Sequence, residues 1–462
     1  MAWDGGLSGL DESKLNRVFL HPEHRANLSN VTWLLERCDA AGRGVDDLYD
    51  VQAHLFQASY RAQLAAQSIR RALRRVQGLK APDWPGDHTT EIAELVAPPW
   101  QLSCPSDSSR EEDWRLERHV AERVIRQLRA VGDMLAWRVY NYDRCAIVAL
   151  SRNDPPGPFV GKEGLDYELG KVVEIKNKEG NFVLLHDLTS VLRVLDVTEL
   201  RPDGSCMLRE VKSSATASAT TKARRQLKQA ERLLAAIDGS QPLPGNEAIQ
   251  LWRSRTQLRT HVRDIGPLLD RAEKDGYAAA RINDRVISVL HLLTAARDGR
   301  PQAKWAAYAG LRNRLLEQHQ GVERGPHRLQ VTSTDTTARD PATAPWGIYP
   351  LPARHRAALI CDYLIIQTSA LADSLAERFQ RRGLHAQVLL PERDGTFDTS
   401  TDVLRVAGPR RGMVIHGNAV YQLLMEFVRT DRFIPAISEA LELPHPPQHT
   451  LHTYGNEKAA WN

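Results

Sequence analysis

The sequence predicts an α+β protein whose core is a mixed β-sheet flanked by helices, with largely helical N- and C-terminal regions. Two features of the residue pattern support this fold class. Apolar side chains recur at helical spacing through the first hundred residues and again beyond about residue 300. Between these regions, short runs rich in Val, Leu, Thr and Met alternate with turn-forming residues, as is typical of strands.

Helical periodicity defines the N-terminal region, residues 1–98. Helices are expected near 24–42 and 45–78. The second has an apolar stripe made of Leu48, Val51, Leu55, Ala58 and Ala62. The prolines and glycines of residues 80–87 then indicate a hinge. A further long helix is expected at 111–140.

Two more regions complete the expected organisation. Residues 99–300 should hold the strand-rich core, with a helical insertion near 246–275. Residues 301–462 should form a mostly helical C-terminal domain. Its expected elements are helices near 353–383 and 417–440 and a short strand at 388–390.

Composition excludes several classes of protein. The 462 residues can form two or three domains, and hydrophobic and charged fractions of 42% and 26% are those of a soluble globular protein. No run of about 18 apolar residues and no signal-like N-terminus is present, so we expect a cytoplasmic protein without a membrane span. The five cysteines are scattered without a Cys-x-x-Cys pair, which argues against zinc knuckles and a disulfide framework.

A β-hairpin is predicted between residues 191 and 213. Runs at 191–200 and 205–213 have strand character, and Pro202-Asp203-Gly204 between them is typical of a type I turn that ends on a left-handed glycine. A three-residue loop of this kind pairs Arg201 with Ser205. The register of the whole hairpin follows from that pair.

This register brings candidate catalytic side chains together. It places Asp196 directly opposite Glu210, with Cβ atoms about 5 Å apart. Glu210 and Lys212 lie on one strand face, because side chains alternate along a strand. Two carboxylates can hold Mg²⁺, and a nearby ammonium can orient the attacking water in phosphodiester hydrolysis. The chain uses Lys sparingly, with twelve Lys among 61 basic residues, so a lysine at 212 is informative.

A Glu-x-Lys triplet by itself is a weak signal. The chain contains two others, Glu12-Ser-Lys14 and Glu174-Ile-Lys176, and a solvated surface is the usual explanation for such a pattern. Only the triplet at 210–212 has an opposing aspartate, a turn of suitable length and a following helix.

That helix is predicted at 220–237. Its apolar stripe is Ala223, Leu227, Ala230, Leu234 and Ile237. Gln226 lies on the border of the stripe, from which it can reach the strand face. An ordinary surface role is equally compatible with the pattern.

Together, an acidic helix, a hairpin bearing Asp196 and Glu210-Val211-Lys212, and a helix carrying Gln resemble the core of the PD-(D/E)xK nuclease superfamily. This superfamily includes restriction endonucleases, Holliday-junction resolvases and many phage-defence nucleases. The resemblance is strongest over residues 182–237. It implies a restriction-endonuclease-like core in which Asp196 and Glu210 bind the metal, Lys212 is the catalytic lysine and Gln226 supports them. Leu195 departs from the proline of the family's name.

The superfamily often adds an acid from an upstream helix. Glu168 is the first choice as a further metal ligand, because a short helix there would lead into a strand at 182–185. Asp187 and Asp133 are competing candidates. Downstream, the core needs a further strand. A hairpin of residues 277–282 and 286–292 could supply it.

Nucleic-acid contact must come from local basic patches, since the net charge is only +4. One patch is Arg70, Arg71, Arg74 and Arg75 on the second N-terminal helix. The patch beside the proposed site is Lys222, Arg224, Arg225 and Lys228. Charge runs are also common on solvated helix faces, so both remain candidates.

The expected function is a Mg²⁺-dependent endonuclease, with Mn²⁺ as an alternative ion, that cuts DNA by direct attack of a metal-activated water. By resemblance, the setting would be restriction or antiviral defence, and a transposon-end or repair nuclease shares the same motifs. An inactive nuclease-like binding module for nucleic acid or protein is a second class. The chain has no P-loop, so any ATPase or sensor partner would be a separate protein. A homo-oligomeric scaffold is a third hypothesis.

Overall fold

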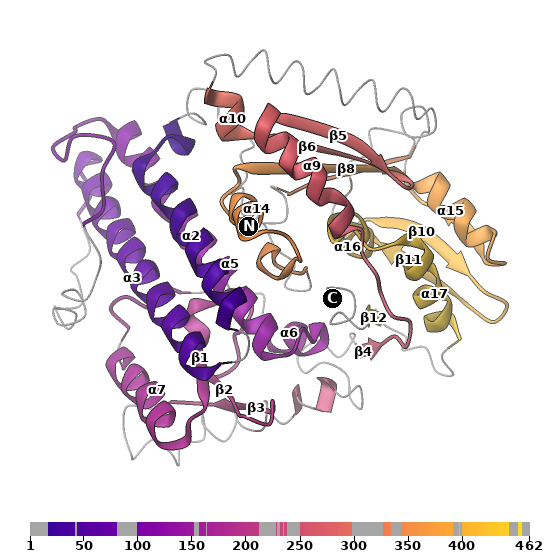
Figure 1. Cartoon of the computed structure of the whole chain (residues 1–462), viewed down its shortest axis with the longest axis horizontal. Helices are drawn as coiled ribbons and strands as arrows, with labels where there is room; N and C mark the ends of the chain where they lie inside the picture. Colours follow the sequence, from indigo (N-terminus) through magenta and orange to yellow (C-terminus); the bar gives the residue numbers. More distant parts are fainter. Residues whose placement is uncertain are drawn as a thin grey trace.

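The computed structural model shows a mixed α+β protein (Figure 1). It describes residues 17–41, 44–80, 99–151, 157–162, 164–211, 250–297, 327–333, 343–390, 397, 400–442 and 451–454, together with 228, 232, 233 and 235–237. Within these residues, no helix combines the length and the apolar character that crossing a bilayer would require.

Three long helices lie at one end of the molecule (Figure 1). They are α2 (Pro22–Ala41), α3 (Val45–Val76) and α5 (Glu111–Val139), close to the three predicted helices. The predicted stripe of α3 is confirmed, because Leu48, Val51 and Leu55 are buried. Helix α3 packs along α5 across the expected hinge, so the N-terminal helices share one core with α5.

The first sheet is antiparallel, in the order β1-β2-β3. Its strands are β1 (Phe182–Leu185), β2 (Val197–Leu200) and β3 (Cys206–Arg209). Helix α7 (Leu165–Glu179) leads into β1, and a 3₁₀ turn, η1 (His186–Leu188), follows it. Glycines in the left-handed region, Gly164 and Gly180, stand at the two ends of α7, where other residues would be strained.

Helix α3 covers the outer edge of β1. The Gln52 side chain donates to the Val183 carbonyl at 2.9 Å and accepts from the Leu185 N–H at 3.1 Å. The Tyr49 hydroxyl accepts from the Val183 N–H at 3.0 Å. These side chains satisfy the backbone groups that an edge strand otherwise exposes.

A second sheet has the order β5-β6-β8-β7, with every neighbouring pair antiparallel. Its strands are β5 (Tyr277–Ile282), β6 (Arg285–His291), β7 (Arg328–Thr332) and β8 (Leu364–Leu371). Helices α9 (Val262–Asp275), α10 (Leu292–Arg297), α14 (Ala353–Ile360) and α15 (Ala372–Gln380) adjoin it. Strands from both sides of residue 300 therefore form one sheet.

The remaining elements complete the C-terminal part. A third sheet has the order β11-β10-β9. It consists of β9 (His385–Val388), β10 (Asp402–Ala407) and β11 (Gly412–His416), and is followed by α16 (Gly417–Met425) and α17 (Thr430–Leu441). Strand β4 (Gln250–Arg253) pairs in parallel with β12 (Leu451–Tyr454). Two short helices are α6 (Arg144–Leu150) and η3 (Trp346–Ile348).

Two expectations are corrected by this topology. The predicted hairpin at 277–292 forms, but it lies in the second sheet and does not extend β1-β2-β3. The described part of the C-terminal region is a mixture of helices and strands, since β7 to β12 lie there beside α14 to α17. The predicted helix at 353–383 is interrupted because the chain turns at Asp362, with φ +58°, and the β-branched run that follows forms β8.

One hydrophobic core extends through the described residues from Val18 to Leu441. A buried ion pair crosses it, with Arg144 of α6 donating to Glu426 at 2.8 and 2.5 Å. Glu426 also accepts from the Ala344 N–H at 2.9 Å. Removing either partner would be strongly destabilising, because the remaining charge would be buried without compensation. The three expected domain ranges stay predictions, with extensive packing across 98 and 300.

Gly132 offers a test of the close approach between α5 and η1. A Cβ at this position would lie 2.0 Å from the Leu188 carbonyl oxygen, so Gly132→Ala must push α5 away from η1. We expect the free energy of unfolding to fall by about 1–3 kcal/mol, measured by urea denaturation. In Gly170→Ala, the new methyl group would meet open space on α7, and a gain of about 0.5–1 kcal/mol is expected. Equal stability of the two variants would contradict the close contact.

Candidate functional site

The predicted hairpin register is confirmed by β2 and β3. Val197 pairs with Arg209 and Leu200 pairs with Cys206, and the Arg201 N–H donates to the Ser205 carbonyl at 3.0 Å. Gly204 is left-handed, with φ +83°, as the turn requires. Asp196 and Glu210 are thus the next residues beyond the last ladder pair, on adjacent strands.

The backbone ladder ends at this point because Leu195 adopts φ +61°. The Val211 N–H donates instead to the Asp196 carboxylate, at 2.7 Å. The Asp196 backbone is held on both sides, since its carbonyl accepts from the His186 N–H at 3.0 Å and its N–H donates to the Arg209 carbonyl at 3.2 Å. Asp196 is consequently fixed beside the end of β3 by three hydrogen bonds.

The His186 side chain is hydrogen-bonded to Leu195, the left-handed residue. Its Nδ1 lies 3.1 Å from the Leu195 carbonyl oxygen, which can only accept, so the ring hydrogen is on Nδ1. Its Nε2 then accepts from the Thr198 hydroxyl at 2.7 Å. Burial lowers the pKa of His186 to about 4, so the ring is neutral near pH 7. A neutral imidazole can make both hydrogen bonds with its single proton.

Two further acids and a lysine gather at the same end of the sheet. Glu168 lies in the first turn of α7 and Asp187 lies in η1. The Lys162 ammonium is 2.8 Å from the Glu168 Oε1 and 2.8 Å from the Asp187 Oδ2. Lys162 and Asp187 are about one third exposed, at 33% and 31%, whereas Glu168 is buried. We call Lys162, Glu168, Asp187, Asp196 and Glu210 the carboxylate site.

Electrostatic coupling connects the members of the carboxylate site. Burial raises the pKa of Asp196, the Val211 N–H and Lys162 partly offset it, and the charges of Glu210 and Asp187 raise it further. Burial likewise raises the pKa of Glu168, with Lys162 opposing and Asp196 and Asp187 adding to the rise. For Lys162, burial favours the neutral amine, but Asp187 and Glu168 outweigh it and hold its pKa above the ordinary value.

The result is a cluster of four acids that shares one ammonium group. The four carboxylates all fall among the described residues, yet no three of them have oxygen atoms within 4.8 Å of one another. Lys162 lies between two of them. Carboxylate oxygens are the donor type that a hard cation prefers, and such a cation commonly takes only one or two carboxylates and completes its coordination with water.

The other predicted site residues have different outcomes. Lys212, Gln226, Lys222, Arg224 and Arg225 lie outside the described residues. Lys228 is an exposed helical residue. Asp133 is not part of the carboxylate site. It accepts from the Ser190 N–H at 2.6 Å and the Val191 N–H at 3.1 Å, and so anchors the loop after η1 to α5.

Sequence reasoning missed Lys162 and treated Glu168 and Asp187 as alternatives. Both acids bind the same ammonium, so they belong to one cluster. A signal for Lys162 was present, because seven of the twelve lysines lie between 162 and 228 in a chain rich in Arg. In the first basic patch, Arg70 pairs with Glu122 of α5 at 3.0 Å.

Comparisons of this chain with protein-family models, with curated proteins and with solved structures find no significant match.

Removing one charge tests whether the carboxylate site is strained. Because the pKa of Asp196 is raised in the folded protein, stability is lost as pH rises from the ordinary carboxyl pKa through the folded-state value. An Asn at 196 avoids this loss and still accepts from Val211. We therefore expect the metal-free Asp196→Asn protein to melt at least as high as wild type at pH 7, with the difference shrinking in acid.

Asp203 provides the matched control on the same hairpin. Its hydrogen bonds with Ser205 lower its pKa, which is the opposite direction. Asp203→Asn should leave the melting temperature unchanged or slightly lower at pH 7. A clear drop in the melting temperature of metal-free Asp196→Asn at pH 7 would refute the proposed charge crowding.

Proposed function

We propose that this protein is a Mg²⁺-dependent endonuclease of the PD-(D/E)xK type, with Mn²⁺ as a substitute ion and DNA as the substrate. The observation that carries the proposal is the convergence of Asp196 and Glu210 at the end of β2 and β3 with Glu168 from α7. The order α7-β1-β2-β3 agrees with the acidic helix and hairpin of that superfamily's core. A restriction-endonuclease-like core is part of this proposal.

The residues fit a hard divalent cation. All four acids offer oxygen ligands, and the raised pKa values of Asp196 and Glu168 mean that their negative charges lack full compensation. Asp196 and Glu210 would hold the ion, with Glu168 as a further ligand. When bound there, Mg²⁺ would polarise the scissile phosphate and acidify a coordinated water.

The chain's own residues supply orientation and charge. The Val211 N–H holds the Asp196 carboxylate, and hydrogen bonds with His186 of η1 and Arg209 of β3 hold the Asp196 backbone. Lys212, which follows Val211 in the sequence, is the proposed catalytic lysine. Lys162 is partly exposed, so its ammonium can shift from the acids to a phosphate oxygen of the substrate. Two lysines would then stabilise the charge of the transition state.

A nuclease-like binding module is the second candidate. One observation favours it, namely that no strand pairs with the outer edge of β3 within the described residues, although a complete core requires one. A binding module would keep its affinity for nucleic acid and form no product with any ion. The proposed biological process is restriction or antiviral defence, with transposon-end cutting and repair as alternatives. The proposed partners are a separate ATPase or sensor protein and a second copy of the chain.

Cleavage assays test the proposal directly. Plasmid, linear duplex, single-stranded DNA and RNA are incubated with the full chain, with and without Mg²⁺ or Mn²⁺. We expect ion-dependent cleavage of DNA, and a fall of at least ~100-fold in rate for Glu210→Ala and for Lys212→Ala.

The chain contains its own matched control for these variants. Glu174 and Lys176 form the same Glu-x-Lys spacing on α7, away from the carboxylate site. Glu174 pairs with Lys171 and Lys178, and Lys176 pairs with Asp46 of α3. Glu174→Ala and Lys176→Ala should cut DNA at the wild-type rate. Wild-type cleavage by both Glu210→Ala and Lys212→Ala, or no product from any substrate with either ion, would rule out the proposed nuclease.

A further inference from the structure

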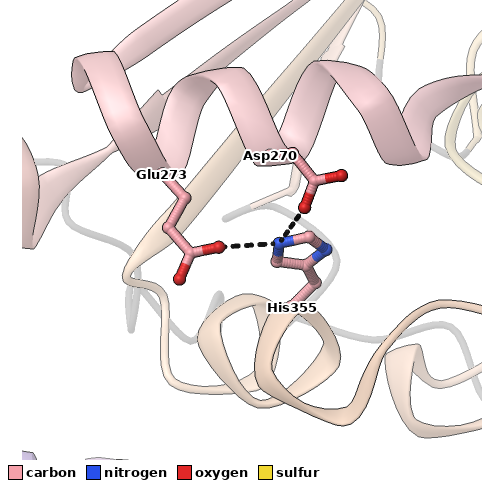
Figure 2. Close-up of side chains that lie close together, drawn as sticks. All are labelled: Asp270, Glu273 and His355. Atoms are coloured by element: carbon pink, nitrogen blue, oxygen red, sulfur yellow. Dashed lines mark hydrogen bonds and ion pairs between the residues drawn. The ribbon is translucent and has the colours of Figure 1, made fainter.

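A second group of metal-ligating side chains lies outside the carboxylate site (Figure 2). Asp270 and Glu273 project from α9 toward His355 of α14. The His355 Nε2 is 3.5 Å from the Asp270 Oδ1 and 3.1 Å from the Glu273 Oε2. The three ligand atoms all lie within 4.8 Å of one another.

The folding of two helices produces this convergence. Asp270 and Glu273 are three residues apart on α9 and so share one helix face. His355 lies in the first turn of α14, and its side chain is only 2% exposed, while both acids are half-exposed. A buried nitrogen therefore faces two carboxylates that remain accessible from solvent.

His355 is shared by two carboxylates, with a hydrogen bond to Glu273 and a longer ion-pair contact to Asp270. A ring nitrogen carries at most one hydrogen, yet two carboxylate oxygens approach the same Nε2. The separations are also compatible with a metal site. Ligands 2.0–2.1 Å from Zn²⁺ at tetrahedral angles are about 3.3 Å apart, and the observed 3.1 and 3.5 Å fall on either side of this value.

Arg354 is the competing cation. Its guanidinium is 2.7 Å from the Asp270 Oδ1 and 3.1 Å from the Glu273 Oε2, the same two oxygens that face His355. The Arg354 side chain is 55% exposed, so it can move away at little cost. Each carboxylate also has a second oxygen, which lets Arg354 remain nearby when the first oxygen binds an ion.

We propose that Asp270, Glu273 and His355 form a site for a divalent cation of the Zn²⁺ type, which ties α9 to α14. The imidazole ligand favours Zn²⁺ over Mg²⁺, whose preferred donors are all oxygen. Three protein ligands leave a fourth position for water. Because α14 also packs against α2, the ion would connect the second sheet with the N-terminal helices.

Zn²⁺ titration of the full, chelator-treated chain tests the site by calorimetry and thermal melting. We expect one equivalent to bind at this site and to raise the melting temperature, in the wild type and equally in Asp196→Asn. The double variant Asp270→Asn with Glu273→Gln should lose at least tenfold in Zn²⁺ affinity. Arg354→Ala should bind Zn²⁺ several-fold more tightly, because the competing guanidinium is gone.

Two controls separate this site from other binding. Asp275→Asn removes an exposed acid at the end of the same helix and should bind Zn²⁺ like wild type. Asp196→Asn should also keep the Zn²⁺ site. The outcome for this site is therefore independent of the outcome for the proposed nuclease. Equal Zn²⁺ affinity of wild type and the double variant, or no saturable binding by either wild type or Arg354→Ala, would overturn it.

Discussion

The end of the β2–β3 ladder determines the character of the carboxylate site. Leu195 turns out of the strand conformation, so the Val211 N–H loses the backbone acceptor that a continued ladder would provide. The Asp196 carboxylate accepts that hydrogen bond instead. A side chain that would otherwise rotate freely becomes part of the sheet's hydrogen bonding, and its charge is held beside Glu210. The charges of Lys162, Glu210 and Asp187 are all coupled to that carboxyl group.

The surrounding scaffold explains how such crowding is tolerated. Helix α3 closes the edge of β1 through Gln52, and α5 approaches η1 so closely at Gly132 that no Cβ fits. These contacts hold β1 and η1, the turn that contains Asp187, in place. Stability is supplied elsewhere, by a continuous apolar core and by buried pairs such as Arg144 with Glu426. In many functional proteins the site itself is destabilising, and the rest of the fold supplies the stability.

Local chemistry was readable from the sequence, and long-range convergence was not. The turn at Pro202-Asp203-Gly204 fixed the hairpin register, because loop length and a left-handed glycine determine strand pairing. Nothing local indicated that Lys162 would bind both Glu168 and Asp187. The left-handed Leu195 was equally unpredictable, since leucine disfavours that conformation. Strand β8 was mistaken for helix because its sequence, in which Gln, Thr and Ser follow three apolar residues, has no clear period of two.

The carboxylate site and the cluster of Asp270, Glu273 and His355 share one electrostatic feature. In each, a basic side chain contacts two carboxylates at once, Lys162 in the carboxylate site and Arg354 between Asp270 and Glu273. Each basic group is about one third exposed or more, so it can leave without burying a charge. A resident cation of this kind lets the chain fold with its acids already converged. Under both proposals, a divalent ion would have to compete only with a partly exposed side chain and would not have to assemble the ligands itself.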